Sequence, residues 1–367
     1  MKSEYRDGAY TFFLEGRIDS SNVDLMETEI RDKSILFDDM DLAFDMEGLE
    51  YISSAGLRVL LKVRKAAKKT IRITNVSDEI FDIFDVTGFG DMFEIERKMR
   101  TISLRGCKKI SSALNGEIFQ LSEDEMIKVY GKNVSMNEVK SERKRAQTAL
   151  IYGIPTLIPY DVVRCDEGFG LIYEKAEMTS LAYILSHDTD KTETCAKMLG
   201  KLMSELHSTE IPKGRLPDIK DRYREWIAEL NDPDDSKVAV FSKLIDSIAD
   251  SNTYVHGDIN LNSVMIHKDE LILLDMAGSA TGHAIFDLQA LFASLVAIEK
   301  RTEGYCRKNY GLSAKVCENF WNIFFDTYMK HRQQEIRSMN ELLAKYFVLK
   351  ENILNKLAIK NRFENRA

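Results

Sequence analysis

The chain has 367 residues, 44% hydrophobic and 30% charged, a composition ordinary for a globular protein with two or three domains, each with its own core. Its formal net charge of -8 does not favour non-specific binding to nucleic acid. The first residues contain no apolar signal core and no apolar run approaches the roughly 18 residues of a membrane span, so we expect a cytoplasmic protein with neither nucleic acid nor a membrane as partner.

The five cysteines are scattered without a Cys-x-x-Cys pair, which is typical of free thiols in a reducing compartment.

Composition also suggests where the chain divides. All five prolines lie between Pro155 and Pro233, and the hydrophobic pattern changes near residues 97–106. We predict a domain over residues 1–103, a second part over 104–177 and a mainly helical third part over 178–367.

Short strands and helices alternate in the first hundred residues. The pattern predicts, in chain order, a strand at 10–14, a turn at 15–19, a helix at 23–30, a strand at 42–44, a loop at 48–52, a helix from Leu57, a strand at 71–73 and a helix capped by Ser77. Such alternation predicts a small α/β domain.

Two serines, Ser53 and Ser54, stand where the helix containing Leu57 is expected to begin. Either hydroxyl can cap that helix. A phosphate on Ser54 would instead lie near backbone N–H groups and the positive end of the helix dipole. The residues alone leave both roles open.

Four motifs of this region, in this order and spacing, are Gly16-Arg17-Ile18-Asp19, the segment 49–57 (LEYISSAGL), Asn75-Val76-Ser77, and Val86-Thr87-Gly88-Phe89 with Phe93. They resemble the STAS domains of bacterial anti-anti-sigma factors. The resemblance implies a mixed sheet with helices, an anti-sigma factor or another regulatory protein as partner, and Ser54 as the phosphorylation switch. The position before the switch is usually Asp in that family and is Ser53 here.

The second part begins with predicted strands. Residues 110–121 form a strand, turn and strand around Gly116, and residues 126–130 form another strand, which contains Lys128. A lysine inside an apolar strand can bind phosphate or can face solvent from an edge strand. The helix predicted at 135–150 offers either Glu138 or Glu142 as an ion-pair partner for Lys128.

Further along, a strand at 170–175 runs into a connector, and helices dominate after about residue 180, including 195–207 and 287–297. The tail is amphipathic, with an apolar stripe of Ile336, Met339, Leu343, Phe347, Ile353 and Leu357. Such a stripe packs on a core or on a partner helix.

A strand pair is predicted between two acidic residues. His256-Gly257-Asp258 precedes apolar runs at 264–266 and 271–274, which flank a polar turn, and Asp275 follows the second run. This arrangement would bring Asp258 and Asp275 to one edge. The two carboxylates could orient a nucleophile and hold a divalent metal on phosphate oxygens, or their role could be structural.

The strand lysine, the helix glutamate, His-Gly-Asp and the later Asp resemble phosphotransferases of the aminoglycoside phosphotransferase and choline kinase type, over about residues 106–330. The resemblance implies an α+β, bilobal kinase-like fold, with ATP and Mg²⁺ as cofactors. It assigns catalysis to Asp258 and His256, bracing of their loop to Asp287, nucleotide binding to Lys128, Glu142, Gly116, Ser111 and Glu174, and metal binding to Asp275.

The sequence departs from that family at two places. Where the family has a second metal ligand, an Asn five residues after the catalytic Asp, this chain has Ser263, with Asn262 one place earlier. Both are candidate metal ligands. The phosphate loop has Ser111 and Ala113 at positions where glycines are expected.

These patterns together predict a regulatory phosphotransferase that transfers the γ-phosphate of ATP to a hydroxyl of a small molecule or of a protein serine, with Ser54 as a specific case. The alternative is a pseudokinase, a nucleotide-binding module that controls what the STAS surface binds. A third hypothesis is a metabolite kinase in which the STAS domain serves only to bind other proteins.

Overall fold

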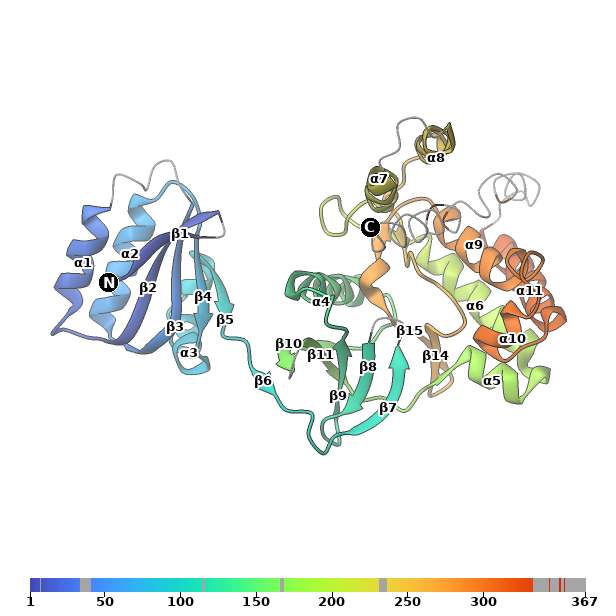
Figure 1. Cartoon of the computed structure of the whole chain (residues 1–367), viewed down its shortest axis with the longest axis horizontal. Helices are drawn as coiled ribbons and strands as arrows, with labels where there is room; N and C mark the ends of the chain where they lie inside the picture. The colour runs from blue at the N-terminus through green and yellow to red at the C-terminus, as the bar shows by residue number, and fades with distance from the viewer. Residues whose placement is uncertain are drawn as a thin grey trace, which may run out of the picture. The chain divides into compact units, whose positions relative to one another are not determined.

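The computed structural model describes residues 1–6, 8–33, 41–113, 116–165, 168–230 and 236–332, and the single positions 343, 350 and 353. The chain divides into two compact units, Met1–Thr101 and Ile102–Ala367 (Figure 1). Each unit has its own hydrophobic core. Within these described residues, no helix is long and apolar enough to cross a bilayer.

The first unit is built on a five-stranded sheet in the order β1-β2-β3-β4-β5. Only β1 and β2 pair antiparallel, and the other neighbouring strands are parallel. The elements are β1 Ser3–Arg6, β2 Ala9–Ile18, α1 Val23–Asp32, β3 Leu42–Ile52, α2 Ser54–Ala66, β4 Ile71–Val76, α3 Asp78–Val86, a 3-10 turn Phe89–Asp91 and β5 Phe93–Arg97. Parallel neighbours need crossover connections, which the helices supply, so the predicted mixed sheet with helices is confirmed.

The turn predicted at 15–19 and the loop predicted at 48–52 are wrong, because β2 continues to Ile18 and β3 to Ile52. The two strands pair in parallel along this length, with register shifts between Phe13 and Glu15 and between Gly16 and Arg17. Gly16 has a φ of 66°. Glycine and polar residues here belong to irregularities within the sheet and do not end the strands.

Helix α2 begins close to the sheet. A Cβ added at Gly56 would lie 2.8 Å from Cγ1 of Ile52 and 2.9 Å from Cγ2 of Ile18, so only glycine allows this approach. Leu57 and Leu60, spaced for one helical face, are buried in the first core. Ser53, just before this helix, and Ser54, its first residue, are thereby held next to the ends of β2 and β3.

The second unit starts with a six-stranded sheet in the order β6-β10-β11-β9-β8-β7. Helix α4 (Met136–Ile151) packs against β10 and β11. The strands are β6 Thr101–Ile102, β7 Lys108–Ala113, β8 Gly116–Gln120, β9 Glu125–Tyr130, β10 Pro159–Cys165 and β11 Gly168–Glu174. Strand β9 is central, which places Lys128 away from any sheet edge.

Helices dominate the rest of the second unit. They are α5 Leu181–His187, a 3-10 turn Thr189–Lys191, α6 Thr192–Leu206, α7 Ile219–Leu230, α8 Ser236–Ser247, a 3-10 turn Met276–Gly278 (η4), α9 Ile285–Phe292 with a π-helical continuation Ala293–Ala297, α10 Tyr305–Tyr310 and α11 Ala314–Arg332. The short strands are β12 Thr179–Ser180, β13 Tyr254–Val255, β14 Val264–His267, β15 Glu270–Leu273 and β16 Ala280–Thr281. This confirms the α+β class predicted for the region.

Strands β14 and β15 form the predicted hairpin, in which Val264 is opposite Leu273. The turn residues Lys268 and Asp269 have φ values of 47° and 67°, the backbone that a two-residue hairpin turn requires. Asp258 precedes this hairpin and Asp275 follows it.

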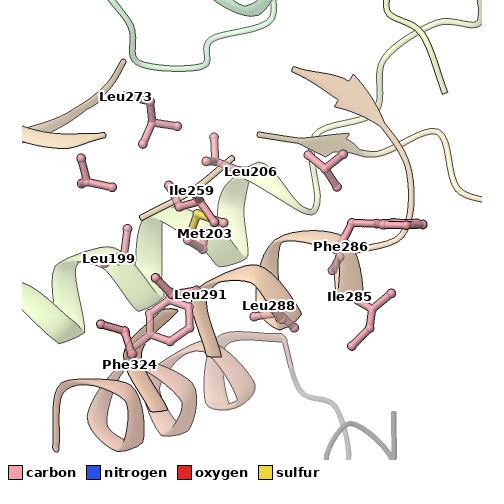
Figure 2. Close-up of a cluster of buried hydrophobic side chains, with 14 of the residues drawn as sticks. Leu199, Met203, Leu206, Ile259, Leu273, Ile285, Phe286, Leu288, Leu291 and Phe324 are labelled. Carbon is pink, nitrogen blue, oxygen red and sulfur yellow. The ribbon is translucent and has the colours of Figure 1, made fainter. Parts of the chain in front are cut away.

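The helical core anchors both acid-bearing segments. Figure 2 shows Ile259 and Leu273 with core residues of α6 and α9. Ile259 is next to Asp258 in the chain, and Leu273 ends the strand before Asp275; their exposed fractions are 2% and 0%. Both segments are therefore fixed to the same packed core.

Two positions of the predicted tail stripe, Leu343 and Ile353, are also buried in this core. The other stripe positions, Ile336, Met339, Phe347 and Leu357, lie outside the described residues. The two buried positions favour core packing for this stripe.

Candidate active site

Lys128 lies at the centre of a buried ion-pair network. Its Nζ donates to Oε1 of Glu142 at 3.0 Å and to Oδ1 of Asp275 at 2.8 Å. Burial alone would lower the pKa of Lys128, but the charges of the two carboxylates outweigh it and raise the pKa above its usual value. Lys128 is therefore a cation held between two acids from different parts of the chain.

The choice between Glu138 and Glu142 is made by the helix cap. Oε2 of Glu138 accepts from the backbone N–H of Ser135 at 2.7 Å, and the Ser135 hydroxyl caps the same helix. Glu142, one turn further, is 3% exposed and also accepts from the Tyr173 hydroxyl at 3.3 Å. Of these two glutamates, Glu142 is the one that contacts Lys128.

Asp275 has a φ of 59°, a left-handed backbone that is uncommon outside glycine. Such strain is typical of functional sites. Its side chain is 35% exposed, compared with 4% for that of Glu142. Asp275 is thus the acid of this network that a ligand can reach.

A small pocket beside Lys128 combines an apolar wall with this charged end. Its lining is Ile118, Met126, Lys128, Glu142, Thr156, Leu157, Tyr173, Leu274, Asp275 and Met276. Apolar walls with a few convergent polar groups are typical of ligand sites. The pocket lining therefore joins apolar side chains to the charged groups of the Lys128 network.

Three other predicted nucleotide residues are absent from this lining. Ser111 is exposed on β7, and Oε1 of Glu174 accepts from the backbone N–H of Ile158 at 2.9 Å. A Cβ at Gly116 would lie 2.1 Å from the carbonyl oxygen of Val129, so glycine is needed there for strand pairing. Gly116 and Glu174 therefore contact neighbouring backbone groups and do not line the pocket.

The loop that contains Asp258 is braced from behind. Oδ2 and Oδ1 of Asp287 accept from the backbone N–H groups of His256 and Gly257, both at 2.7 Å. Asp287 is 1% exposed, and its Oδ2 also contacts Nε2 of His207 at 3.1 Å. Burial would raise the pKa of Asp287, but hydrogen bonding and the charge of His207 lower it, so the brace is ionised.

His256 is fully buried and positions Asp258. Its Nε2 is 2.8 Å from the carbonyl oxygen of Leu274, and its Nδ1 is 3.3 Å from the backbone N of Asp258. With the proton on Nε2, the ring donates to the first and accepts from the second. His256 therefore links the Asp258 loop to the residue before Asp275 and acts through its neighbours.

Two cations contact the Asp258 carboxylate. Nη2 of Arg222, in α7, donates to Oδ2 at 3.0 Å, and Nζ of Lys350 contacts Oδ1. Burial would raise the pKa of Asp258, but the charges of Lys350 and Arg222 outweigh it and lower the pKa to about 2. Asp258 is a carboxylate throughout the physiological pH range.

These contacts predict how stability depends on pH. Because the pKa of Asp258 is about 2 in the folded protein and about 3.9 when unfolded, its stabilisation is present above about pH 4 and is lost as the pH falls toward 2. The expected contribution is on the order of 2 kcal/mol. Urea unfolding of wild type and Asp258→Asn should differ by this amount at pH 6 and converge near pH 2; a difference independent of pH would contradict it.

Neither candidate for the second metal ligand is directed at Asp275 by its contacts. The Ser263 hydroxyl is buried and exchanges hydrogen bonds with the backbone N and O of Asn260, both at 3.1 Å. Nδ2 of Asn262 donates to the carbonyl oxygen of Asn309 at 3.2 Å. Both side chains are used within the loop or toward α10.

Among the described residues, no group of three or more His, Cys, Asp or Glu side chains forms a metal site. Asp275, which is partly exposed, nevertheless fits Mg²⁺, because this ion keeps waters and is bound by one or two carboxylates together with substrate phosphates. Any metal here would depend on phosphate oxygens for its remaining ligands.

In the first unit, the structure separates the two serines. The Ser53 hydroxyl accepts from the backbone N–H of Gly56 at 3.3 Å and caps α2. Ser54 is the first residue of the helix and is exposed. The cap is Ser53, which leaves the Ser54 hydroxyl accessible.

Sequence reasoning missed the basic residues around Asp258. Arg222 and Lys350 are 36 and 92 residues from it in the chain, and Arg145 in α4 contacts the carbonyl oxygen of Ala277 in η4. Each stands in an ordinary amphipathic pattern. No local signal distinguishes them from solvent-facing cations.

Comparisons with known proteins find two kinds of similarity. Residues 1–102 match the STAS domain family. A protein of Bordetella bronchiseptica described as an anti-sigma factor antagonist, BtrV, is 30% identical over 95 residues, which cover 24% of this chain and 78% of that protein.

Solved aminoglycoside phosphotransferases match in structure. The 3'-phosphotransferase of type VIII has a TM-score of 0.49 at 17% identity, over 67% of this chain and 93% of that one. APH(3'')-Id of Streptomyces rimosus has a TM-score of 0.46 at 13% identity, over 75% and 98%. Through its first 102 residues the chain belongs to the STAS family, and a region matching aminoglycoside phosphotransferase structures follows.

Proposed function

We propose that the second unit is an ATP-dependent phosphotransferase that transfers the γ-phosphoryl group to a hydroxyl, and that the STAS domain couples it to a regulatory partner such as an anti-sigma factor. The network of Lys128, Glu142 and Asp275 beside the pocket carries this proposal. We place the activity in the cytoplasm, with a β-rich lobe over 104–177 and a helical lobe over 178–367.

Lys128 would bind the phosphates, because it is a fixed, buried cation at the polar end of the pocket. Glu142 holds Lys128 in place, and Glu142 is itself fixed because its side chain is buried on α4. Mg²⁺ held by Asp275 and phosphate oxygens would supply charge neutralisation during transfer.

Asp258 would orient the acceptor hydroxyl. The acceptor oxygen forms a bond to the γ-phosphorus as the bond to the β–γ bridging oxygen breaks, and ADP leaves. With a pKa of about 2, Asp258 is a weak base. It would hold the hydroxyl by a hydrogen bond and take its proton only as the new bond forms.

The acceptor can be a small molecule or a protein serine, and Ser54 is the specific protein case, in cis or between subunits. Incubation with γ-labelled ATP and Mg²⁺, followed by ADP measurement with a panel of hydroxyl compounds and mapping of protein label, tests both. ADP formation above the level of Asp258→Asn supports transfer. Its absence with every acceptor, while nucleotide is bound, would reject it.

The two serines provide a matched pair for the protein case. Ser54→Ala should abolish any label in the STAS domain and change stability by less than about 0.5 kcal/mol, because its hydroxyl is exposed and does not cap α2. Ser53→Ala should keep the label and cost about 1 kcal/mol, because it removes the cap. Label that survives Ser54→Ala would exclude Ser54 as acceptor.

A pseudokinase remains the second candidate, and the contacts of Ser263 and Asn262 favour it. If no second metal ligand lies beside Asp275, as in the part of the chain that the structure describes, nucleotide would bind through Lys128 without needing Mg²⁺. Calorimetry with ATP distinguishes the two: metal-independent binding without turnover supports the pseudokinase, and binding that requires Mg²⁺ and leads to ADP supports the enzyme.

A further inference from the structure

Basic side chains gather around Asp258. Arg222 and Lys350 both contact its carboxylate, and Arg145 lies near enough to Arg222 for their charges to interact. Burial and the charge of Arg222 lower the pKa of Arg145, whereas Glu142, Glu225 and Asp258 raise it less. In direct contact, two cations therefore face the single carboxylate of Asp258 at a partly buried position.

Arg222 is held in position by two contacts. Its guanidinium lies 4.8 Å from the centre of the Trp226 ring in the same helix, and it donates a hydrogen bond to Asp258. A Cβ added at Gly278 would lie 2.7 Å from Oδ2 of Asp258 and 3.1 Å from Nη1 of Arg222, so glycine makes room for this pair. The positive charge is preorganised and does not depend on a flexible surface chain.

Hydrogen-bond capacity also remains unused. Nη1 of Arg222 is buried without a hydrogen-bond partner in the part of the chain that the structure describes. Lys350 uses two of its three N–H groups among the described residues, on Oδ1 of Asp258 and on the carbonyl oxygen of Gly257, 2.9 Å away. A buried, unpaired donor on a charged group favours an anionic acceptor of hydrogen bonds.

Lys350 is brought to this place by the core. Leu343 and Ile353, seven residues before it and three after, are both buried in the second unit's core. All three described positions are helical. The side chain of Lys350 is only 12% exposed.

We propose that the phosphoryl acceptor is a small hydroxyl compound that also has a carboxylate or phosphate group, and that Arg222 and Lys350 hold this anion while the hydroxyl meets Asp258. The identity of the compound as acceptor rests on the proposed phosphotransfer; the anion site itself does not. A cationic acceptor would meet the repulsion of these two basic side chains.

Binding of matched compounds to the full-length protein tests the anion site without any turnover. D-gluconate, D-glucose and D-glucosamine present a carboxylate, no charge and an ammonium group on similar polyols, and glycerol 3-phosphate and glycerol form a second pair. By calorimetry at low salt, at least one anion should bind about tenfold more tightly than its neutral counterpart, and glucosamine should bind most weakly. Equal affinities within both pairs, or a preference for glucosamine, would overturn the proposal.

Substitutions test which residues produce the preference for anionic over neutral compounds. Arg222→Gln and Lys350→Met should each remove most of this preference. Arg224→Gln is the control, because Arg224 is on the same helix but pairs with Asp221 and Asp246 at 3.1 and 3.0 Å. Preference kept in both Arg222→Gln and Lys350→Met, or lost equally in Arg224→Gln, would contradict the assignment.

ADP formation with the same compounds separates the two hypotheses. Anion binding without phosphorylation of any compound would leave the anion site standing and count against the proposed enzyme. Phosphorylation of glucose or glucosamine in preference to gluconate would support the enzyme and overturn the acceptor assignment.

Discussion

Asp258→Asn is expected to lower the kcat of phosphoryl transfer by about 10²–10⁴-fold, because an amide oxygen cannot take the acceptor's proton. The affinity for MgATP should change by less than about threefold, since Asp258 contacts Arg222 and Lys350 and not Lys128. Single-turnover ADP formation and calorimetric ATP binding measure the two effects.

Asp221→Asn provides the control for this experiment. Asp221 is an exposed acid of α7 whose partner is Arg224, so the same chemical change there should leave kcat unchanged. Wild-type turnover in Asp258→Asn would exclude Asp258 from the chemistry. Loss of both ATP binding and turnover in Asp258→Asn would show that the substitution disturbs the structure.

Lys128→Met is expected to have the second large effect. It leaves Glu142, with a side chain only 4% exposed, without its cation, and breaking a buried pair on one side costs about 3–5 kcal/mol. MgATP binding should fall below detection, because the only strand cation in the pocket lining is gone. Urea unfolding and calorimetry check the two parts.

The double variant Lys128→Met/Glu142→Leu distinguishes stability from binding. Replacing both members of a buried ion pair by apolar groups can be nearly neutral, so most of the lost stability should return. ATP binding should not return, because the phosphate-binding cation is still absent. Recovery of ATP binding in the double variant would show that Lys128 does not contact phosphate.

Local pattern was sufficient wherever a residue's role depends on its own neighbours in the chain. The hairpin between Asp258 and Asp275 followed from two apolar runs and a polar turn, and the structure confirms it. The helix containing Glu142 followed from the helical pattern of residues 135–150, and the structure adds the Ser135 cap. In both cases hydrogen bonds within a few residues determine the backbone.

Local pattern failed where strand pairing or competition for a partner decided the outcome. Glycine at positions 16 and 48 indicated turns, yet parallel pairing of β2 with β3 keeps both in strands. Ser53 and Ser54 were equivalent as caps until the start of α2 was placed. Ser263 and Asn262 were both candidate metal ligands, and nothing in the sequence indicated their contacts with Asn260 and with the carbonyl oxygen of Asn309.

The residue types and their order in the chain were enough to predict an α/β domain followed by an α+β region, because short-range periodicity determines helices and strands, and motifs within single segments carry the resemblance to STAS domains and kinase-like phosphotransferases. Folding alone brought Arg222, Lys350 and Arg145 around Asp258 and excluded Glu138 from Lys128. Coulomb energy depends on distance in space, which residue order does not encode. The charge that an acceptor would meet at Asp258 is for that reason a property of the tertiary structure.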